Sequence, residues 1–542
     1  MPERPARGGR ATVKARRWDR YLWILPLFWA TGLSSNSAIS VRDFGARGDG
    51  IAKDTQAIQT AIDKAAGHGG TIVFPPGSYV SGTIHLRSNV SVTIESGAIL
   101  LLSPDDADFD PYEALPYQPT HAAKYHPPAT IPADASPAQR RRRAAPVAYD
   151  DEETNYFHYA LFAGVGIHNV AIEGDGVIEG NRDRRYGPKP IAFKNSEWIT
   201  IRGITIKNAP NYAVSLGGTD HVDVDRVKIL NAFADGIDPD GCHFVRITNS
   251  YIDSHDDAIC PKSSWALGKP RSVEHLVVAN CVLRTAANCF KFGSESAGDL
   301  RDVAVTNCVM SRRDTERIPN SGISLESVDG ANIENVVIEN ISMQDAAVPL
   351  FIRLSNRGRG LDPAVPGSIR NLSIRNIVAT GATLTSSITG IHDAIIRDVM
   401  IDGFSVTAEG GAAMSDAEVP EFAKKDPDST MFGQLPAVGL YGRYVEGLTI
   451  SGLQIHSRRP DARPAVVLEE AGTLAISGFS STVGSPAGPI ILLRNVAGAL
   501  LSGIQFSSDM QVFLAVEGER SSAITMEGND LRRATQPFRR SK

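Results

Sequence analysis

Hydrophobic and polar residues alternate in short stretches along much of the chain, and most of these stretches end at asparagine or glycine. Examples are WITIRG from residue 198, HVDVDR from 221, FVRITN from 244, VVIEN from 336 and LSIRN from 372. Alternation with a period of two is typical of a β-strand with one buried face. Each stretch therefore predicts a short strand followed by a turn.

The stretches recur at intervals that indicate a solenoid. Ile199, Val222 and Val245 occupy the same place in three successive stretches and are 23 residues apart, while later spacings lengthen to between 27 and 49. Periods of about 20 to 50 residues are typical of repeat architectures. The spacing of a leucine-rich repeat and the aromatic signature of a propeller blade are both missing. We predict an all-β fold, a single-stranded right-handed parallel β-helix whose insertions are loops.

The alternating pattern is interrupted once and ends near each terminus, which divides the chain into regions. Thr55, Ile58, Ala61, Ile62 and Ala65 are spaced as on one face of a helix, which would cap the open edge of the solenoid. We expect the cap and first coils over 39–103, a Pro- and Ala-rich loop insertion over 104–156, the parallel β-helix over 157–530 and a tail over 531–542.

The amino-terminal segment has the pattern of an export signal. A stretch rich in Lys and Arg precedes the apolar run YLWILPLFWATGL (21–33), and small residues follow up to Ala38. We predict a signal peptide over 1–38 and a secreted or periplasmic protein without stable membrane insertion after cleavage. An uncleaved anchor and a misassigned start are the alternatives.

Composition narrows the possible partners. The net charge is only −6 over 542 residues, so no strongly basic surface is indicated and nucleic acid is not an expected partner. The five cysteines, all between Cys242 and Cys308, are odd in number and form no CxxC pair. This argues against a disulfide framework and a zinc site, and we expect neither a metal nor another cofactor. We expect a monomer.

Aspartates gather in two neighbouring repeats, ADGIDPDGC (234–242) and DSHDDAIC (253–260). Asp235 follows Val222 by 13 residues and Asp256 follows Val245 by 11, so both should lie on one side of adjacent coils, about 4.8 Å apart. With Asp257 they would form a cluster in which repulsion and burial keep one carboxyl protonated and others ionised. Glycoside hydrolysis needs such an acid and base.

The other aspartates of these repeats have simpler interpretations. DPDG (238–241) is an ordinary turn sequence, so Asp238 and Asp240 are interpreted as turn residues. The ligand spacing of a calcium-binding loop is missing.

Taken together, ADGIDPDGC, DDAICPKS, DFGARGDGIAKDTQAIQTAI near the start and GDGVIEGN (174–181) resemble glycoside hydrolase family 28, the polygalacturonase family. The resemblance implies a right-handed parallel β-helix and inverting hydrolysis of a pectin-type, galacturonate-containing polysaccharide or oligosaccharide. It also implies that Asp256 is the general acid and that Asp235 and Asp257 activate water, with no metal.

The chain departs from two motifs of that family. Its Gly-His-Gly motif should fall at NCFKFGSES (288–296), where Cys289 takes the place of the histidine. Its Arg-Ile-Lys motif should fall at SGISLES (321–327), where Ser324 and Glu326 stand instead of the basic residues. Lys262, Lys291 and Arg353 are possible replacements, with Lys291 paired to Glu295 or Glu326. The predicted substrate-binding residues are thus Lys262, Cys289, Lys291, Glu295, Ser324, Glu326 and Arg353.

Two other functions fit the same solenoid. A polysaccharide lyase or epimerase acting on uronates would need a base at C5, a role in which Lys291 could serve. A non-catalytic carbohydrate-binding β-helix would also explain the loss of two family motifs. The three aspartates favour the hydrolase, and whether it attacks internally or from a chain end is left open.

Overall fold

The computed structural model describes residues 38–111, 158–313, 317–359, 361, 363–414, 418–483, 488–506 and 508–541. Residues 38–542 cluster as one compact unit. The predicted signal peptide, apart from Ala38, and most of the predicted loop insertion at 104–156 lie outside the described residues. None of the described helices is long and apolar enough to cross a membrane.

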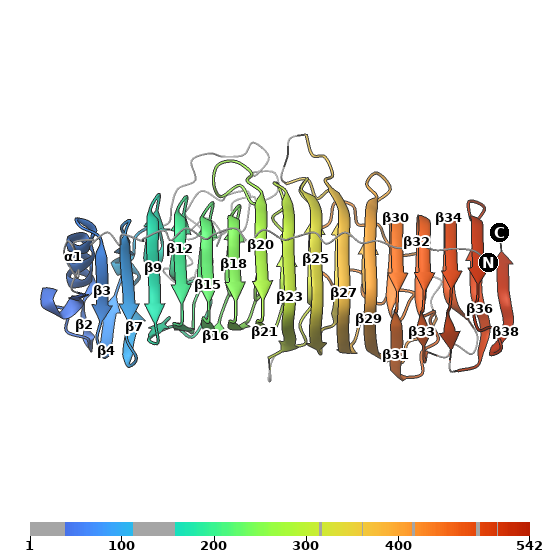
Figure 1. Cartoon of the computed structure of the whole chain (residues 1–542), viewed down its shortest axis with the longest axis horizontal. Helices are drawn as coiled ribbons and strands as arrows, with labels where there is room; N and C mark the ends of the chain where they lie inside the picture. Colours follow the sequence, from blue (N-terminus) through green and yellow to red (C-terminus); the bar gives the residue numbers. More distant parts are fainter. Residues whose placement is uncertain are drawn as a thin grey trace, which may run out of the picture. The chain divides into compact units, whose positions relative to one another are not determined.

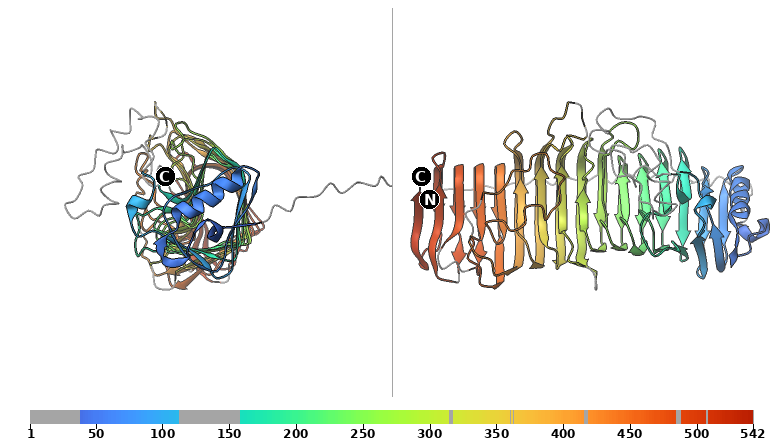
Figure 2. Two further views of the ribbon diagram at one scale, coloured as in Figure 1. Left: turned by 90° about the vertical axis from the view of Figure 1, so that its left-hand side faces the viewer. Right: turned by 180° about the vertical axis from the view of Figure 1, so that it is seen from behind.

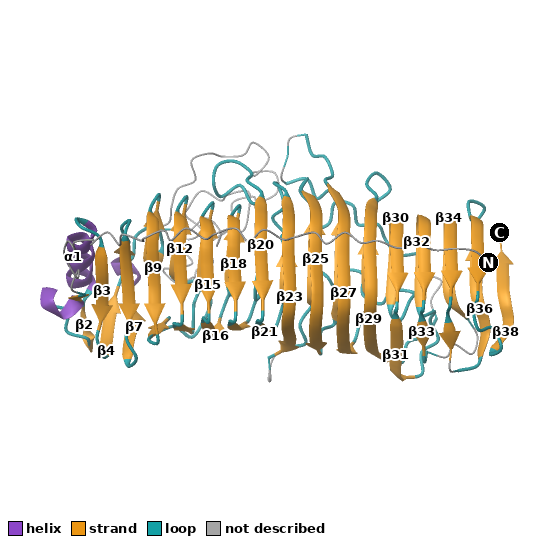
Figure 3. Ribbon diagram, viewed as in Figure 1, coloured by secondary structure: helices purple, strands orange, loops and turns teal. Residues whose placement is uncertain are grey.

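The unit is a right-handed parallel β-helix, which confirms the predicted fold class (Figures 1 and 3). Each coil contributes one strand to each of three faces, here named sheets A, B and C in chain order, and each strand pairs in parallel with its counterpart one coil away. In sheet A, Ile199 pairs with Val222 and Val222 with Val245. The 23-residue spacing is therefore the length of one coil in this part of the chain.

Sheet A begins at the amino-terminal end of the unit, and most of its strands are labelled in Figure 1. Its separate strands are β1 (Ile39–Ser40), β3 (Gly70–Phe74), β6 (Val90–Ile94), β9 (His168–Gly174), β12 (Glu197–Arg202), β15 (Asp220–Asp225), β18 (His243–Thr248), β20 (Val273–Ala279) and β37 (Ser522–Glu527). Four long strands run on from sheet A into sheet B: β23 (Leu300–Arg312), β25 (Asn332–Gln344), β27 (Ser368–Ala382) and β29 (Ile396–Gly410).

Sheet B follows after a short turn in each coil. Its separate strands are β2 (Asp49–Lys53), β4 (Gly77–Ser81), β7 (Ala98–Leu102), β10 (Val177–Glu179), β13 (Thr205–Lys207), β16 (Lys228–Ala232), β19 (Tyr251–Ser254), β21 (Val282–Thr285), β31 (Gln454–Arg459), β33 (Ser480–Ser481) and β35 (Gln505–Phe506).

Sheet C carries the candidate site. Its separate strands are β5 (Ile84–His85), β8 (Ala160–Val165), β11 (Lys189–Lys194), β14 (Val214–Gly217), β17 (Ile237–Asp240), β22 (Asn288–Phe292), β24 (Ser321–Ser327), β26 (Val348–Leu354), β28 (Ser386–Thr389), β36 (Met510–Glu517) and β38 (Ala534–Ser541). Three further strands run on from sheet C into sheet A: β30 (Leu440–Ser451), β32 (Val466–Ser477) and β34 (Pro489–Ser502). Because β38 pairs with β36, the predicted tail at 531–542 is wrong: most of it forms the last strand, although its side chains are largely exposed and gave no clear alternation.

Stacked aliphatic side chains fill the interior. Along sheet A, Val222, Val245 and Leu276 are fully buried and lie in register on successive coils. Burying one such side chain contributes about 1.5–3 kcal/mol, and repetition over every coil holds the stack together. The site is thus built on a rigid support.

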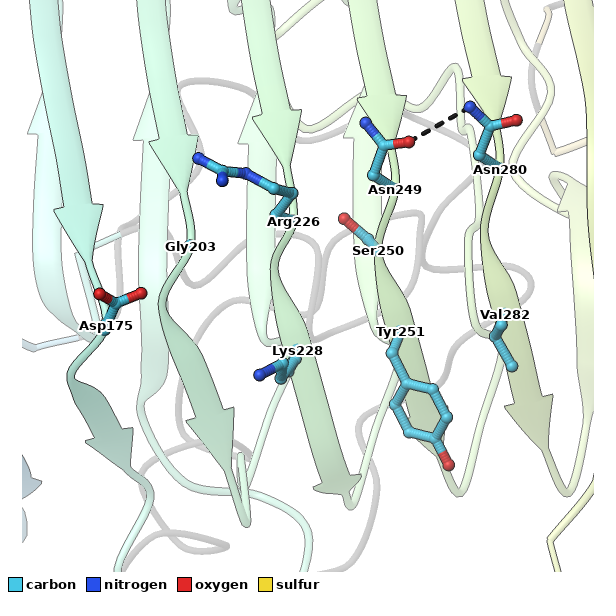
Figure 4. Close-up of a pocket in the computed structure, with 9 residues that line it drawn as sticks. All are labelled: Asp175, Gly203, Arg226, Lys228, Asn249, Ser250, Tyr251, Asn280 and Val282. Carbon is cyan, nitrogen blue, oxygen red and sulfur yellow. Dashed lines mark hydrogen bonds between the residues drawn. The ribbon is translucent and has the colours of Figure 1, made fainter. Parts of the chain in front are cut away.

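An asparagine ladder fixes the turn from sheet A to sheet B. Asn249 and Asn280 adopt left-handed φ values of 54° and 58°, which asparagine tolerates better than most residues. The Asn280 amide donates to the Asn249 side-chain oxygen at 3.2 Å (Figure 4), and the same contact continues through Asn307, Asn340 and Asn376. The surface pocket of Figure 4, which also includes Asp175, Lys228 and Tyr251, lies at this turn and contains none of the three candidate catalytic aspartates.

Helix α1 (Thr55–Ala66) caps the amino-terminal end, as predicted. It lies across the end of the stack in the left view of Figure 2, and it buries Ile58, Ala61, Ile62 and Ala65. The Thr55 hydroxyl accepts a hydrogen bond from the Gly82 N–H at 2.9 Å, so this side chain anchors the helix. Two short 3-10 helices, η1 (Val41–Phe44) and η2 (Asp106–Asp108), complete the described helical segments.

A long connection covers sheet C towards its carboxyl-terminal end. Residues 418–439, here called the covering loop, precede β30. Leu435 and Ala437 of this loop form a second apolar cluster with Tyr441, Val467 and Leu492 on the outer face of sheet C, and Val419 and Phe432 pack against it. This face is therefore buried on both sides in the later coils.

Candidate active site

The three predicted catalytic aspartates lie together at the turn from sheet B to sheet C. The N–H of Gly236 donates to the Asp257 carbonyl at 2.9 Å, and Ile237 pairs with Ile259. Asp235 is therefore in register with Asp257, and not with Asp256 as the sequence spacing suggested. Single carboxylate oxygens of Asp235, Asp256 and Asp257 all lie within 4.8 Å of one another. The predicted cluster is present, with one pairing shifted by a residue.

Exposure separates the three carboxylates. Asp235 and Asp257 are 3% and 4% exposed, whereas the side chain of Asp256 is 32% exposed. A substrate approaching from outside would therefore meet Asp256 first, with the two buried carboxylates behind it.

Each carboxylate is paired with a different cation. Lys262 Nζ lies 3.1 Å from Asp235 Oδ2, and Lys291 Nζ lies 3.1 Å from Asp257 Oδ2. Arg185 Nη1 contacts Asp256 Oδ2 at 2.5 Å. The chain's own side chains thus compensate the charge of the cluster.

Further hydrogen bonds hold the buried pairs in place. Lys262 also contacts Asp238 Oδ2 at 2.7 Å and donates to the Tyr212 hydroxyl at 2.8 Å. Asp257 Oδ1 accepts from both the main-chain N–H and the side-chain amide of Asn288, at 3.1 and 2.6 Å. Such networks fix side-chain positions when every member is paired.

The carboxyl groups differ in proton affinity. Burial raises the pKa of Asp235 well above its usual value, the charge of Asp238 adds to this, and Lys262 only partly offsets it. Burial also raises the pKa of Asp256, but the Arg185 guanidinium, with Lys291 and Lys262, outweighs burial and leaves that pKa lowered. In the free protein, Asp235 therefore holds a proton more readily than Asp256 does.

The lysines of the site are cations and not bases. Burial by itself lowers the pKa of Lys291, but the carboxylates of Asp257 and Glu326 outweigh burial and raise it well above its usual value. For Lys262, burial is likewise outweighed, mainly by Asp238, with Tyr212 and Asp235 adding to the rise in pKa.

Ser324 and Glu326 lie next to this cluster. Ser324 pairs in register with Lys291 on the neighbouring coil, and its hydroxyl donates to Glu326 Oε1 at 2.7 Å. Burial raises the pKa of Glu326 although Lys291 opposes the rise. The structure thus brings Lys262, Lys291, Ser324 and Glu326 to the aspartates.

Cys289 does not line the site, and its predicted contact with substrate is wrong. Its side chain is buried in the main core, and its Sγ contacts the Leu283 carbonyl at 3.8 Å. Burial raises the pKa of the thiol to about 12. Regular alternation in β22 begins only at Phe290, so Cys289 and Lys291 do not share a face. The neighbour of Asp257 on the next coil is Asn288.

The prediction that Arg353 binds substrate is also wrong. Its guanidinium donates to the main-chain carbonyls of Gly390, Glu421 and Phe422 at 3.2, 2.6 and 3.2 Å. Burial lowers its pKa to about 10. Arg353 is only 1% exposed because the covering loop closes over it, and it therefore anchors this loop rather than binding substrate.

Glu295, Asp238 and Asp240 have roles that the pattern did not indicate. Glu295 is buried and pairs with Arg359 at 3.3 Å, so it is not the ion-pair partner of Lys291. Asp238 and Asp240 lie on strand β17 and are buried. The interpretation of these two as simple turn residues is wrong, because DPDG continues the sheet and its carboxylates contact Lys262 and Ser264.

Sequence reasoning missed Asn288 and Arg185. Asn288 could have been found by counting, since 288 − 257 and 276 − 245 both equal 31 and Val245 pairs with Leu276. Arg185 lies in the irregular segment NRDRRYG, which carries no period. The loop is positioned by the N–H groups of Tyr186 and Gly187, which donate to the Pro210 carbonyl at 2.7 and 3.2 Å.

The accessible part of sheet C is short along the solenoid axis. Following the position of Lys291 through successive coils leads to Ser324, Phe351, Ser387 and Tyr441. These four are at most 1% exposed. In the other direction, Ala192 and Ala163 of the same sheet are also buried. Within the described residues, the outer face is thus closed on both sides of the aspartates.

Comparisons with known proteins agree with this fold. Residues 38–95 match the family "Rhamnogalacturonase A/epimerase, pectate lyase-like", a region that contains no residue of the candidate site. A structure of a hyperthermoactive exopolygalacturonase from Thermotoga maritima is similar with a TM-score of 0.56 at 17% identity, covering 77% of this chain and 91% of that one.

Curated relatives extend over most of the chain. A probable polygalacturonase from Vitis vinifera is 25% identical over 405 residues, which is 68% of this chain and 76% of the relative. An exo-poly-alpha-D-galacturonosidase from Dickeya chrysanthemi is 24% identical over 419 residues, covering 65% of this chain and 64% of the relative. Residues 144–425, more than half of the chain and including all three aspartates, match "Glycosyl hydrolases family 28". The chain therefore belongs to glycosyl hydrolase family 28 and is a glycoside hydrolase.

Proposed function

We propose that this enzyme hydrolyses the glycosidic bonds of a galacturonate-containing polysaccharide or oligosaccharide. Asp256 protonates the leaving oxygen, and Asp235 and Asp257 activate the attacking water. The observation that carries the proposal is the arrangement of the three carboxylates, in which only Asp256 is substantially exposed and the other two lie behind it. The names of the relatives and the cations Arg185 and Lys291 support an anionic substrate.

The buried carboxylates are suited to hold one water together. Two oxygens no more than 4.8 Å apart can both accept hydrogen bonds from a water placed about 2.8 Å from each. Such a water, held by two bases and facing the acid, supports inversion. Inverting enzymes usually separate the acid and base carboxyl groups by about 6.5–9.5 Å and retaining enzymes by about 5–5.5 Å. Here single oxygens of Asp256 and the two buried carboxylates lie within 4.8 Å of one another, so the distance alone does not establish inversion. The anomer of the product thus needs its own measurement.

That measurement is proton NMR of the first product, recorded before mutarotation equilibrates it. The expected result is the anomer opposite to that of the substrate linkage. The substrate's own anomer would show a covalent intermediate and would contradict the inverting mechanism, while leaving the hydrolase assignment intact.

We also propose that the enzyme cleaves the polysaccharide from its chain ends. A long polymer lying along the solenoid axis would need an open face over several coils, but sheet C is buried on both sides of the aspartates among the described residues. The expected products are small sugars released from the start of the reaction, with little early loss of viscosity. A rapid fall in viscosity would instead show internal attack.

The lyase and epimerase alternatives need a neutral base, and Lys291 is not suited to this. Its ion pair with Asp257 and its raised pKa keep it charged. The deciding experiment incubates the purified enzyme with pectic polysaccharides and oligosaccharides while following reducing ends and ultraviolet absorbance. New reducing ends without absorbance are expected, whereas absorbance from an unsaturated product would favour a lyase.

Export and a monomeric state complete the proposal. A polymeric cell-wall substrate and the apolar run at 21–33 support a secreted or periplasmic enzyme. Cell fractionation and mass spectrometry of the mature amino terminus test export, and light scattering of the purified enzyme tests the oligomeric state.

A further inference from the structure

Arg185 occupies a position that the proposed chemistry leaves unexplained. It pairs with Asp256, the residue that must carry a proton in order to act as general acid. A cation at this position favours the ionised carboxylate. In the free enzyme, the acid is therefore held in the form that cannot donate.

The ion pair is accessible to an incoming substrate. The side chains of Arg185 and Asp256 are 30% and 32% exposed, whereas the pairs of Lys262 with Asp235 and Asp238 are almost fully buried. A substrate can thus replace the contact between Arg185 and Asp256 without opening the core. The main-chain contacts from Tyr186 and Gly187 to Pro210 hold the loop while the side chain changes partner.

A uronic acid supplies the replacing group at the right place. In a galacturonan joined through O4, the carboxyl carbon of the leaving ring is bonded to C5, and the neighbouring C4 carries the bridging oxygen. When Asp256 lies within hydrogen-bond distance of that oxygen, as a general acid must, this carboxylate lies within a few ångströms of Arg185. Arginine binds carboxylates in a planar, two-pronged geometry.

No basic side chain stands at Ser324 or Glu326 to take this carboxylate instead. Both residues are buried and hydrogen-bonded to each other, and Arg353 is bound by the covering loop. Among the described residues, Arg185 is the exposed guanidinium in contact with the aspartate cluster.

We propose that Arg185 binds the carboxylate of the uronic-acid ring on the leaving-group side, and that this exchange releases Asp256 to act as general acid. The inference rests on the proposed function of Asp256. It makes Arg185 both a determinant of specificity for the free acid and a positioning residue for the proton. A neutral or esterified ring would leave Asp256 paired and ionised.

The proton needed at Asp256 is already present in the cluster. Asp235 holds a proton more readily than Asp256 in the free enzyme, and single oxygens of the two lie within 4.8 Å, close enough for one water to relay it. When Arg185 leaves, the proton moves from the Asp235 carboxyl to the Asp256 carboxylate. Asp235 becomes the base, Asp256 becomes the acid, and the net charge of the pair does not change. The other charged groups around Asp256 are Asp257, Lys262 and Lys291.

The test compares Arg185→Gln with Arg184→Gln in the full-length enzyme. Arg184 is the adjacent residue, carries the same charge and is exposed, so it is the matched control. The substrates are a free-acid oligogalacturonide and its methyl ester. Losing one charge-assisted pair with the substrate should lower kcat/KM for the free acid about ten- to a hundredfold. The value for the ester should rise, because Arg185 no longer holds Asp256 in its ionised form. Arg184→Gln should keep the wild-type preference.

The pH profile separates this role from a merely structural one. The alkaline limb of kcat/KM reports the acid of the free enzyme. Among the cations that lower the pKa of Asp256, Arg185 has the largest effect, so the limb should move to higher pH in Arg185→Gln and stay in place in Arg184→Gln. Arg185→Lys, which keeps the charge without the two-pronged geometry, should retain the wild-type limb while losing part of the preference for the free acid.

Two results would overturn the inference. One is a wild-type preference for the free acid together with an unshifted pH limb in a folded Arg185→Gln. The other is undiminished binding of galacturonate by Arg185→Gln in calorimetry, a readout that needs no turnover. Failure of the proposed function is distinct: Asp256→Asn would then keep near-normal activity whatever Arg185→Gln does.

Discussion

The outer face of sheet C has two regions at equivalent strand positions. One is a partly exposed cluster of charged side chains, and the other is buried beneath the covering loop. Around β17, β22 and β24, carboxylates and cations face one another and part of the cluster is exposed. From β26 onward, equivalent positions hold Phe351 and Tyr441, and the covering loop buries them. The position on the strand is the same, so the covering segment decides which region can react.

Polar side chains show the same contrast. In the covered region, Arg353 donates to main-chain carbonyls of the loop, and Tyr441 donates to Glu469 at 2.8 Å. These groups stabilise local structure. In the site, Asp235 and Asp257 pair with lysines while Asp256 reaches the exterior, so charges of one sign are held close together. Such clusters shift pKa values and are typical of active sites.

The largest expected effect concerns activity and not stability. Asp256→Asn removes the proton donor and should lower kcat at least about a hundredfold, the usual scale of general acid catalysis. Initial rates of reducing-end release measure this, with thermal melting as the check on folding. The control is Asp223→Asn, which should keep full activity. Asp223 lies on sheet A of the neighbouring coil and pairs with Arg246. Equal activity in both variants would remove Asp256 from the mechanism.

A substitution in the covered region should instead lower the stability of the protein. Phe351→Ala leaves a cavity beneath the covering loop and should lower the free energy of unfolding by about 3–5 kcal/mol. Denaturant titration measures the loss. Val378→Ala is the matched control because Val378 is 48% exposed, and it should change stability by less than about 0.5 kcal/mol. A small effect at Phe351 would mean that the loop does not depend on this face.

Asn288 tests the point where the two regions meet. Its amide donates to Asp257, and its oxygen accepts from Ser321 at 2.7 Å and from Ser429 of the covering loop at 3.4 Å. Asn288→Ala removes a hydrogen bond to a charged group, and we expect kcat to fall about ten- to a hundredfold. Ser429→Ala should have a much smaller effect. If Ser429→Ala were the more harmful change, the loop and not Asn288 would position Asp257.

The smallest expected effect is on the pH dependence of stability. Because burial raises the pKa of Asp235 in the folded protein, the folded state binds more protons than the unfolded state above about pH 4, the usual pKa of aspartate. Wild-type stability should therefore fall relative to Asp235→Asn as pH rises above this value, by at most about 1.4 kcal/mol per pH unit. Urea titrations of both proteins at several pH values measure the difference. A difference that grows in the other direction would show that Asp235 is ionised when folded.

Sequence alone determined the repeating parts of the molecule. The strand alternation and the 23-residue spacing set the coil and its register, the helical spacing of Ile58, Ala61 and Ile62 located the cap, and the aspartate-rich repeats located the site. These features are predictable because the period of a strand or helix depends on local backbone geometry, and because stacking identical coils repeats one register.

Tertiary structure decided what the irregular segments do. Asp257 rather than Asp256 is in register with Asp235 because strand β16 carries one extra residue between Ile229 and Ala232. Cys289 turns into the core because it follows Asn288, the neighbour of Asp257, just as the buried Ala258 follows Asp257. Arg353 is bound by a loop from a distant part of the chain, and Arg185 reaches Asp256 across 71 residues. Such contacts depend on where non-periodic loops pack against the finished solenoid, and local periodicity carries no information about that packing.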